Sequence, residues 1–375
     1  MTPDPLQHER EHPGRMTGRP IVAMEPVAGD LRGAIRRALQ ASEFTRFVPK
    51  GSAVSLKVNL GWDMFIPGSI TSPFFVEALI AEIRDHAGPI FMVEADQVLE
   101  DIESAFRRSG MADVCRRTGV TWVNMDRGES APEDAPDNVV LKRPPVPKIL
   151  RETVLVSVPV MKTHAKTVIT GALKNQWGCL PKMRHEYHLV LDDAIADLNA
   201  TLRPRFAIMD GTVGLQGNGP KSGSPRIADR ILASADLVAL DTIHATTIGV
   251  DPARVRHLQT CSARGLGVSD IAKIEVRGLD PVKDRVAFLP AKHNAVSVVE
   301  NLLRKSALKR LFFNTPIFDV CLWGAKNYYR IWTRLHAERC WRGVLEHPVY
   351  GPLWKAALAD GARGVASTGQ SKTAA

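Results

Sequence analysis

The sequence lacks several features that would place it in a familiar class of protein. No stretch of its 375 residues reaches the run of about 18 apolar residues that a membrane-spanning helix needs. The five cysteines are scattered without a Cys-x-x-Cys pair, which argues against a disulfide framework or a cysteine-built metal cluster. The first 18 residues carry both charge signs and no apolar run of the kind found in secretory signals. We therefore expect a cytoplasmic protein with a disordered leader over residues 1–18.

Nucleotide-binding signatures are missing as well. The segment GLQGNGPKSG at 214–223 is rich in glycine, but it does not have the Gly-x-x-x-x-Gly-Lys-Ser/Thr spacing of a phosphate-binding loop. No Gly-x-Gly-x-x-Gly turn follows the first expected strand at 21–24. The glycine-rich segment therefore keeps two interpretations: a flexible lid or backbone cradle over a ligand, or a plain irregular loop.

The patterns that are present predict an α/β fold. A hydrophobic content of 45% and a charged content of 24% are typical of a globular protein with a sizeable core. Strand patterns alternate with helical patterns as far as residue 278, which predicts a mostly parallel sheet with helices on both faces. The expected strands are 21–24, 53–60, 89–95, 121–125, 154–160, 205–211 and 273–278, and the expected helices are 29–42, 72–87, 98–110, 191–202 and 237–249.

The composition changes towards the C-terminus. Residues 303–375 contain 12 Lys and Arg against 4 Asp and Glu, together with four of the seven Trp and three of the four Tyr. We expect an α/β domain over 19–294, a basic, aromatic helical extension over 295–360 and a disordered tail over 361–375. The extension has three interpretations: a cap packed on the core or on a second subunit, a contact with a lipid or an anionic membrane surface, or a nucleic-acid site. No recognised nucleic-acid motif supports the third.

Three separate segments place polar residues where the expected strands end. Because ligands of an open α/β sheet gather outside the carboxyl ends of its strands, we expect these residues to share one site. Lysines, hydroxyls and loop amides together favour a bound carboxylate or phosphate, and clustered lysines lower one another's pKa until one can serve as a base. The alternative is a solvated loop face. The candidate anion-binding residues are Lys57, Asn59, Thr71, Lys174, Asn175, Gly217 and Gly219, and the candidate catalytic residues are Lys162, His164 and Asp210.

Two of these residues also suggest a metal site. His164 follows an apolar strand, where it suits a general acid or base, a metal ligand or a hydrogen-bonded loop residue. Asp210 ends the strand 205–211 and suits a catalytic role, a metal ligand or an Asx-turn. His188, which forms a His-x-x-His pair with His185, completes the candidate set of ligands for a divalent metal: His164, His188 and Asp210.

Three further carboxylates are weaker candidates. Glu94 and Asp96 follow the strand 89–95, so the same positional argument applies to them. Asp241 lies within the apolar pattern of the helix 237–249, where a buried carboxylate needs a partner such as one of the lysines.

Several blocks recur here in the order typical of one family. They are the KVN strand with a downstream Thr-x-Pro, the block MKTH…TGALKN-x-x-G, the block MDG…G-x-GP and the helix LVALDTIHATTIGVDP. Over roughly residues 50–270 the chain resembles the domain of unknown function 362 family. The resemblance implies an α/β fold and does not assign an activity. Many such relatives carry a ferredoxin-type cysteine cluster, which this chain lacks, so no iron–sulfur cluster is expected.

The sequence thus predicts an enzyme that acts on an anionic small molecule by acid/base or metal-assisted chemistry. Isomerisation, elimination and redox chemistry all remain open. The alternative is a non-catalytic protein that binds an anionic metabolite or a metal cofactor. The expected location is cytoplasmic or peripheral at a membrane, with a homo-oligomer and a lipid contact through residues 303–375 as the partner interpretations.

Overall fold

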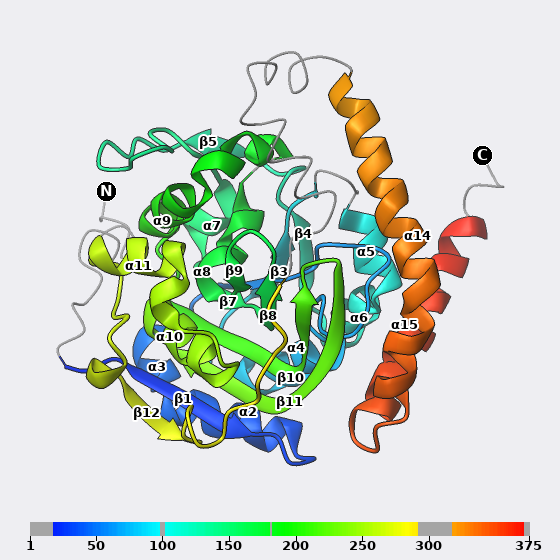
Figure 1. The fold of residues 1–375 in the computed structure, drawn as a ribbon, viewed down its shortest axis with the longest axis horizontal. Coiled ribbons are helices and arrows are strands. Elements are labelled where there is room, and N and C mark those ends of the chain that lie inside the picture. The colour runs from blue at the N-terminus through cyan, green and yellow to red at the C-terminus, as the bar shows by residue number, and fades with distance from the viewer. Residues whose placement is uncertain (1–17, 98–101, 181, 292–316, 371–375) are drawn as a thin grey trace.

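A ten-stranded mixed sheet forms the centre of the molecule (Figure 1). The computed structural model describes residues 18–97, 102–180, 182–291 and 317–370, so the leader expected before residue 18 lies outside it. Eight strands follow one another across the sheet in the order β12 (Glu275–Gly278), β1 (Ile21–Pro26), β11 (Ser222–Ser234), β10 (Phe206–Asn218), β7 (Val154–Val158), β2 (Val54–Val58), β3 (Ile90–Glu94) and β4 (Thr121–Asn124). β8 (Val160–His164) pairs with β10 and with β9 (Val168–Thr170), and β5 (Ser130–Pro132) pairs with β6 (Pro145–Pro147) in a separate sheet.

The sheet is parallel except at β11 and β9. β12 and β1 are parallel, as are β10, β7, β2, β3 and β4, whereas β11 runs antiparallel between β1 and β10. The predicted α/β class is therefore confirmed, and β12, which lies in the strand expected at 273–278, is at the edge of the sheet. The carboxyl ends of β2, β3 and β7 lie side by side, which brings the candidate segments to one edge of the sheet.

Helices cover both faces of the sheet. The helices are α2 (Leu31–Ala41), α3 (Phe44–Phe47), α4 (Pro73–Ile83), α5 (Ile102–Arg108), α6 (Met111–Thr118), α7 (Lys148–Glu152), α8 (Ala172–Asn175), α9 (Leu191–Leu202), α10 (Leu237–Thr247), α11 (Arg256–Ala263), α14 (Ile317–Leu345) and α15 (Tyr350–Gln370). Short 3-10 helices span Gln176–Cys179, Lys182–Val190, Pro252–Arg254 and Ile271–Lys273.

Successive side chains of β10 pack alternately into two hydrophobic cores, one on each face of the sheet. Phe206 and Ile208 pack into the cluster beneath α2 and α4, while Ala207 and Met209 pack into the cluster beneath α9 and α10. Successive side chains of a strand point to opposite faces, so a continuous apolar run fits a strand that is buried on both sides.

The glycine-rich segment is an ordered hairpin, which corrects both interpretations of it as a lid or an irregular loop. β10 and β11 pair from Ala207–Ser234 as far as Asn218–Ser222. Hydrogen bonds between strands use backbone groups, so glycine can occupy a strand. It is favoured there where a neighbouring segment packs so closely that a Cβ would not fit. A Cβ at Gly214 would lie 2.6 Å from the Met161 carbonyl oxygen, so this glycine lets the hairpin pack closely on β8.

The apolar run 154–160 forms two strands instead of one. β7 ends at Val158, and the chain changes direction at Pro159 before β8 begins at Val160. Proline has no backbone N–H to donate to a ladder, which favours a break at this position. Beyond the break, β8 pairs in parallel with β10, so Lys162 and His164 lie on a strand beside β10.

The C-terminal helices are packed on the α/β core. α15 buries Tyr350 and Trp354 completely in the cluster that contains α2 and α4. α15 continues to Gln370, so the helical region extends beyond residue 360, where the sequence predicts a disordered tail. The described part of the extension thus includes a helix that belongs to the core of the domain, as the cap interpretation requires.

Replacing Trp354 with alanine tests this packing. Loss of a fully buried indole should lower the free energy of unfolding by about 3–5 kcal/mol. Trp323→Ala is the matched control, because Trp323 is 69% exposed and its loss should change that free energy by no more than about 0.5 kcal/mol. Urea denaturation followed by circular dichroism measures both. Equal, small effects would show that α15 is not part of the cooperative core.

Candidate functional site

A buried ion pair joins the carboxyl ends of β2 and β3. Lys57 Nζ lies 2.9 Å from Glu94 Oε2, with the two side chains 1% and 2% exposed. Lys57 Nζ also donates to the Val58 carbonyl oxygen at 2.8 Å, while Glu94 accepts from the backbone N–H groups of Leu60 and Ala95. Since its charge is balanced and its surface is covered, Lys57 is not placed to bind an anion, contrary to the sequence prediction.

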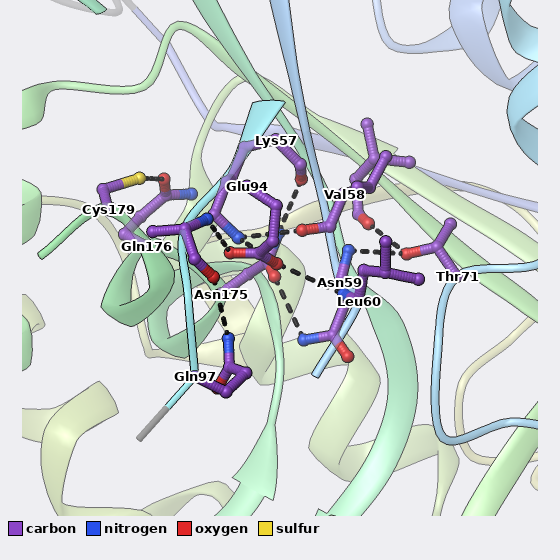
Figure 2. A network of polar contacts seen from close by, with 12 residues as sticks. Lys57, Val58, Asn59, Leu60, Thr71, Glu94, Gln97, Asn175, Gln176 and Cys179 are labelled. Atoms are coloured by element: carbon purple, nitrogen blue, oxygen red, sulfur yellow. Dashed lines mark hydrogen bonds and ion pairs between the residues drawn. The ribbon is translucent and has the colours of Figure 1, made fainter. Parts of the chain in front are cut away.

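Three predicted ligand residues form a network beside this pair (Figure 2). Asn59 donates its backbone N–H to Thr71 Oγ1 at 2.9 Å and its side-chain amide to Asn175 Oδ1 at 3.2 Å. Thr71 donates to the Val158 carbonyl, and Asn175 donates to the Lys57 carbonyl, each at 2.8 Å. These contacts tie β2, β7 and α8 together, so the three residues position the site rather than offer unpaired groups to a ligand.

Lys162 forms a hydrogen bond to this network through Asn59. Its Nζ donates to Asn59 Oδ1 at 2.7 Å and to the Ser69 carbonyl oxygen at 2.9 Å. No third partner of Nζ is found in the described ranges. Burial, together with the charge of Lys174, lowers the pKa of Lys162 to about 7, although Glu94 acts in the opposite direction. Near neutral pH this amine is therefore a usable base, with two of its N–H groups held by acceptors.

His164 is neutral, and its tautomer is defined. Its Nδ1 accepts from the backbone N–H groups of Lys166 at 3.0 Å and Thr167 at 3.3 Å, so the proton resides on Nε2. Burial, reinforced by the charges of Lys174, Lys162 and Lys166, lowers its pKa well below the ordinary value. A neutral imidazole whose Nδ1 is occupied offers a hydrogen-bond donor at Nε2, so in this state it is a donor rather than a base.

Lys174 is the cation most available to a ligand. Its side chain is half-buried on α8, and no hydrogen bond or ion pair of its Nζ occurs within the part of the chain that the structure describes. Burial, with the charges of Lys166, Arg184 and Lys57, lowers the pKa of Lys174 to about 7. Unlike Lys57, it has no carboxylate partner there, so its positive charge is uncompensated.

Asp210 has a structural environment. It is fully buried, and Oδ2 accepts from the backbone N–H of Ser72 at 2.8 Å. Oδ1 accepts from the backbone N–H and the hydroxyl of Thr212 at 3.0 and 2.6 Å. The carboxylate thus joins the β10–β11 hairpin to the start of α4. Because both oxygens are occupied, the structure does not support the catalytic role predicted for Asp210, and the Asx-turn reading fits it better.

The glycine amides of the hairpin tip are occupied too. Gly217 N–H donates to the Leu289 carbonyl at 2.9 Å, and Gly219 N–H donates to the Gly217 carbonyl at 2.8 Å. A Cβ at Gly219 would lie 2.1 Å from the Thr163 carbonyl oxygen, so this glycine permits close packing against β8. The predicted anion cradle at Gly217 and Gly219 is therefore not formed.

The predicted metal set does not assemble. Within the residues that the structure describes, no group of three or more His, Cys, Asp or Glu side chains is arranged to hold a metal ion. His188 Nδ1 lies 3.2 Å from Lys166 Nζ, and Asp210 is enclosed by backbone donors. The side chain of His185 lies outside the described part. The three predicted ligands, His164, His188 and Asp210, thus each have other hydrogen-bond partners and do not converge on one metal position.

Two features of the site differ from what the sequence predicts. Asp241 accepts from the backbone N–H groups of Ala172 at 2.7 Å and Leu173 at 3.0 Å, so it caps the start of α8 instead of pairing with a lysine. Arg184 is almost fully buried and donates to the carbonyls of Leu180 and Asp96. Arg184 is not predicted from the sequence, because a single arginine in a polar segment normally indicates a solvated surface.

The His164 tautomer gives a first prediction for the site. Because burial lowers its pKa, the ring should remain neutral, with its proton on Nε2, throughout the range from pH 6 to pH 9. Nitrogen-15 NMR of labelled histidine measures both the tautomer and the titration. Protonation of His164 near its ordinary pKa would contradict this description.

The Glu94→Gln variant tests the buried pair. It leaves the ammonium of Lys57 buried without a counter-charge, which should lower the free energy of unfolding by about 3–5 kcal/mol. Glu129→Gln removes the exposed partner of Lys148 and should cost at most about 1 kcal/mol. Chemical denaturation compares the two variants with the wild type. Similar costs for both would mean that the Lys57–Glu94 pair contributes little to the stability of this edge.

Comparison with known proteins places the chain in a family. A family model described as "Domain of unknown function (DUF362)" matches residues 54–246, which contain β2 to β11, most of α10 and all the predicted site residues. The chain belongs to this family, as its sequence blocks predict. A thylakoid-associated protein from Synechocystis sp. is 26% identical over 301 residues, which cover 77% of this chain and 88% of the relative.

Among solved structures, the lactate racemase apoprotein from Thermoanaerobacterium thermosaccharolyticum matches with a TM-score of 0.35 and 12% identity. The match covers 66% of this chain and 57% of the racemase, so the chain spans less than two thirds of that protein. No helix among the described residues is long and apolar enough to cross a bilayer.

Proposed function

We propose that the protein is an enzyme that binds a small carboxylate- or phosphate-bearing molecule and transfers a proton on it. The observation that carries this proposal is the uncompensated positive charge of Lys162 and Lys174, whose pKa values burial lowers to about 7. Burying cations without counter-charges is costly, so an arriving oxyanion would be stabilised by them. Glu94 balances Lys57 and leaves the other two lysines for the ligand.

The three residues have separate roles in this proposal. Lys174 holds the anion as its counter-charge. Lys162, whose N–H groups are held by Asn59 and Ser69, accepts the proton in its neutral form and is left as an ammonium. The Nε2–H of His164 donates a hydrogen bond to the oxygen that gains charge. Isomerisation and elimination both begin with such a proton abstraction.

Anion-linked proton uptake tests the binding part. At pH 8 a lysine with a pKa near 7 is about 90% neutral, and a bound anion restores the proton of Lys174, its counter-charge, so binding should take up as much as about one proton. Calorimetric titration with inorganic phosphate or citrate in buffers of different ionisation enthalpy measures this uptake. Lys174→Met should lose most of the affinity, whereas the exposed Lys273→Met should bind as the wild type does. Binding without proton uptake would contradict the proposed lysine state.

The same lysines set the pH dependence of stability without a ligand. Their folded-state pKa values lie below the unfolded value of about 10.4, so the unfolded chain binds more protons above pH 7. Their contribution to the free energy of unfolding should therefore rise between about pH 7 and pH 10, and Lys162→Met should flatten this rise. Denaturation at several pH values measures it, with Lys273→Met as the control. A slope unchanged in Lys162→Met would contradict the assignment.

Hydrogen exchange separates an enzyme from a binding protein. A panel of carboxylates and phosphate esters is incubated with the protein in D2O, and carbon-bound deuterium is measured by mass spectrometry. The wild type should introduce deuterium into its substrate, and Lys162→Gln should bind the same anion without exchange. Anions that bind but never exchange would instead support the non-catalytic binding protein.

We also propose that the protein works at a membrane surface. Its cyanobacterial relative is described as thylakoid-associated, and no helix in the described ranges is suited to span a bilayer, so the association would be peripheral. The exposed apolar side chains of α14 favour this location over free diffusion. Sedimentation of the full-length protein with lipid vesicles tests it, and a protein that stays in the supernatant with every vesicle would contradict it.

A further inference from the structure

The inner face of α14 packs against the α/β domain. Thr333 and Val344 are buried on it. The ring of Tyr329 packs edge-on against that of Trp62, 6.2 Å away. Lys221 Nζ, from the tip of the β10–β11 hairpin, lies 3.6 Å from the Trp62 ring and 5.4 Å from the Tyr329 ring. These cation–π and aromatic contacts hold the helix in one orientation, so its opposite face is presented consistently to the outside (Figure 1).

That outer face exposes four large apolar or aromatic side chains among polar ones. Trp323, Ile331 and Leu335 are 69%, 58% and 73% exposed, and Tyr328 is 37% exposed. With 3.6 residues per turn, these four side chains fall within a sector of about 140°. Large side chains that stand together on one exposed face mark an interaction surface, whereas scattered ones need no explanation.

Charged side chains lie at the edges of this sector and within it. Arg334 and Arg339 are exposed and make no ion pair among the described residues, and they lie close to the two edges of the apolar sector. Arg342 lies within the sector and pairs with Glu338 at 2.7 Å. Arginine side chains at the margins of an apolar strip can reach the headgroup level while the apolar groups enter the acyl boundary.

We infer that the outer face of α14, formed by Trp323, Tyr328, Ile331, Leu335, Arg334 and Arg339, docks on an anionic lipid bilayer. The inference rests on the proposed membrane location and names the surface and the lipid charge responsible for it. Anionic headgroups complement the arginines, and the acyl boundary receives the indole and the aliphatic side chains.

Vesicle sedimentation with the full chain tests the inference. The wild type should bind vesicles of phosphatidylcholine with phosphatidylglycerol and bind poorly to phosphatidylcholine alone, and added salt should weaken binding. Trp323→Ala combined with Ile331→Ser and Leu335→Ser should abolish binding. Arg334→Gln and Arg339→Gln should each weaken it about fivefold. The control is Val139→Ser with Val282→Ser, which removes exposed apolar residues elsewhere and should leave binding unchanged.

The outcomes separate this inference from the proposals it rests on. A wild type that binds no vesicle overturns both the docking surface and the membrane location. Binding that survives the triple α14 substitution overturns the docking surface and leaves the location standing. A wild-type dimer that becomes monomeric in the triple variant, seen by light scattering, overturns the lipid occupant in favour of a second copy. Unchanged denaturation midpoints confirm that the variants fold, and the anion titration tests the enzymatic proposal independently.

Discussion

The Lys57–Glu94 ion pair is the interaction on which the carboxyl edge of the sheet depends. It lies between two neighbouring parallel strands, and its surroundings exclude water almost completely. Gly178 lies directly over it, since a Cβ there would be 2.3 Å from Glu94 Oε1. The negative charge of Glu94 is balanced by Lys57, so Glu94 provides no full counter-charge to the other lysines of this edge. Burial therefore acts on Lys162 and Lys174 without a full counter-charge and lowers their pKa values to about 7.

Two other carboxylates of this region, Asp210 and Asp241, accept hydrogen bonds from backbone N–H groups. Asp210 receives the N–H groups of Ser72 and Thr212, and Asp241 receives those at the start of α8. A buried carboxylate that accepts backbone donors is stabilised where it is and has no oxygen to offer a distant ammonium. The carboxylates Asp210 and Asp241 thus connect segments of the backbone. The amines of Lys162 and Lys174 remain at the carboxyl edge of the sheet without a carboxylate partner. This division supports the proposal that the site binds an anion, and it explains why the described residues do not form a His/carboxylate metal centre.

The sequence predicts the position of the site better than the roles of its members. The alternating patterns and the strand-end argument place Lys57, Lys162 and Asp210 at the correct edge, because strand ends can be found from apolar runs and turns. Whether a polar atom is already used depends on partners far away in the chain, as with Lys162 and Ser69 or Asp210 and Ser72. Local pattern carries no information about such pairs, so Lys57, Asn59 and Gly217 are predicted as ligand residues although their groups are occupied.

The same limit explains the hairpin and the C-terminal helices. Glycines in 211–223 predict a loop, since glycine weakens a strand, but close packing against β8 requires positions without a Cβ. In the extension, aromatics occur on both sides of α14, so composition alone cannot assign one face to the core and the other to the exterior.

The structure makes that assignment, and it also shows side-chain contacts between α14 and the loop at the carboxyl edge of the sheet. Trp62, which contacts α14 through Tyr329, belongs to the loop that carries Asn59 and Ser69, the acceptors of Lys162. Lys221 connects the same contact to the hairpin whose strands support β8. A force or a ligand that moved α14 would therefore act on the residues that hold Lys162. If α14 rests on a membrane, the loop beside the proposed base is anchored at that surface, and the location and the chemistry of the protein become parts of one arrangement.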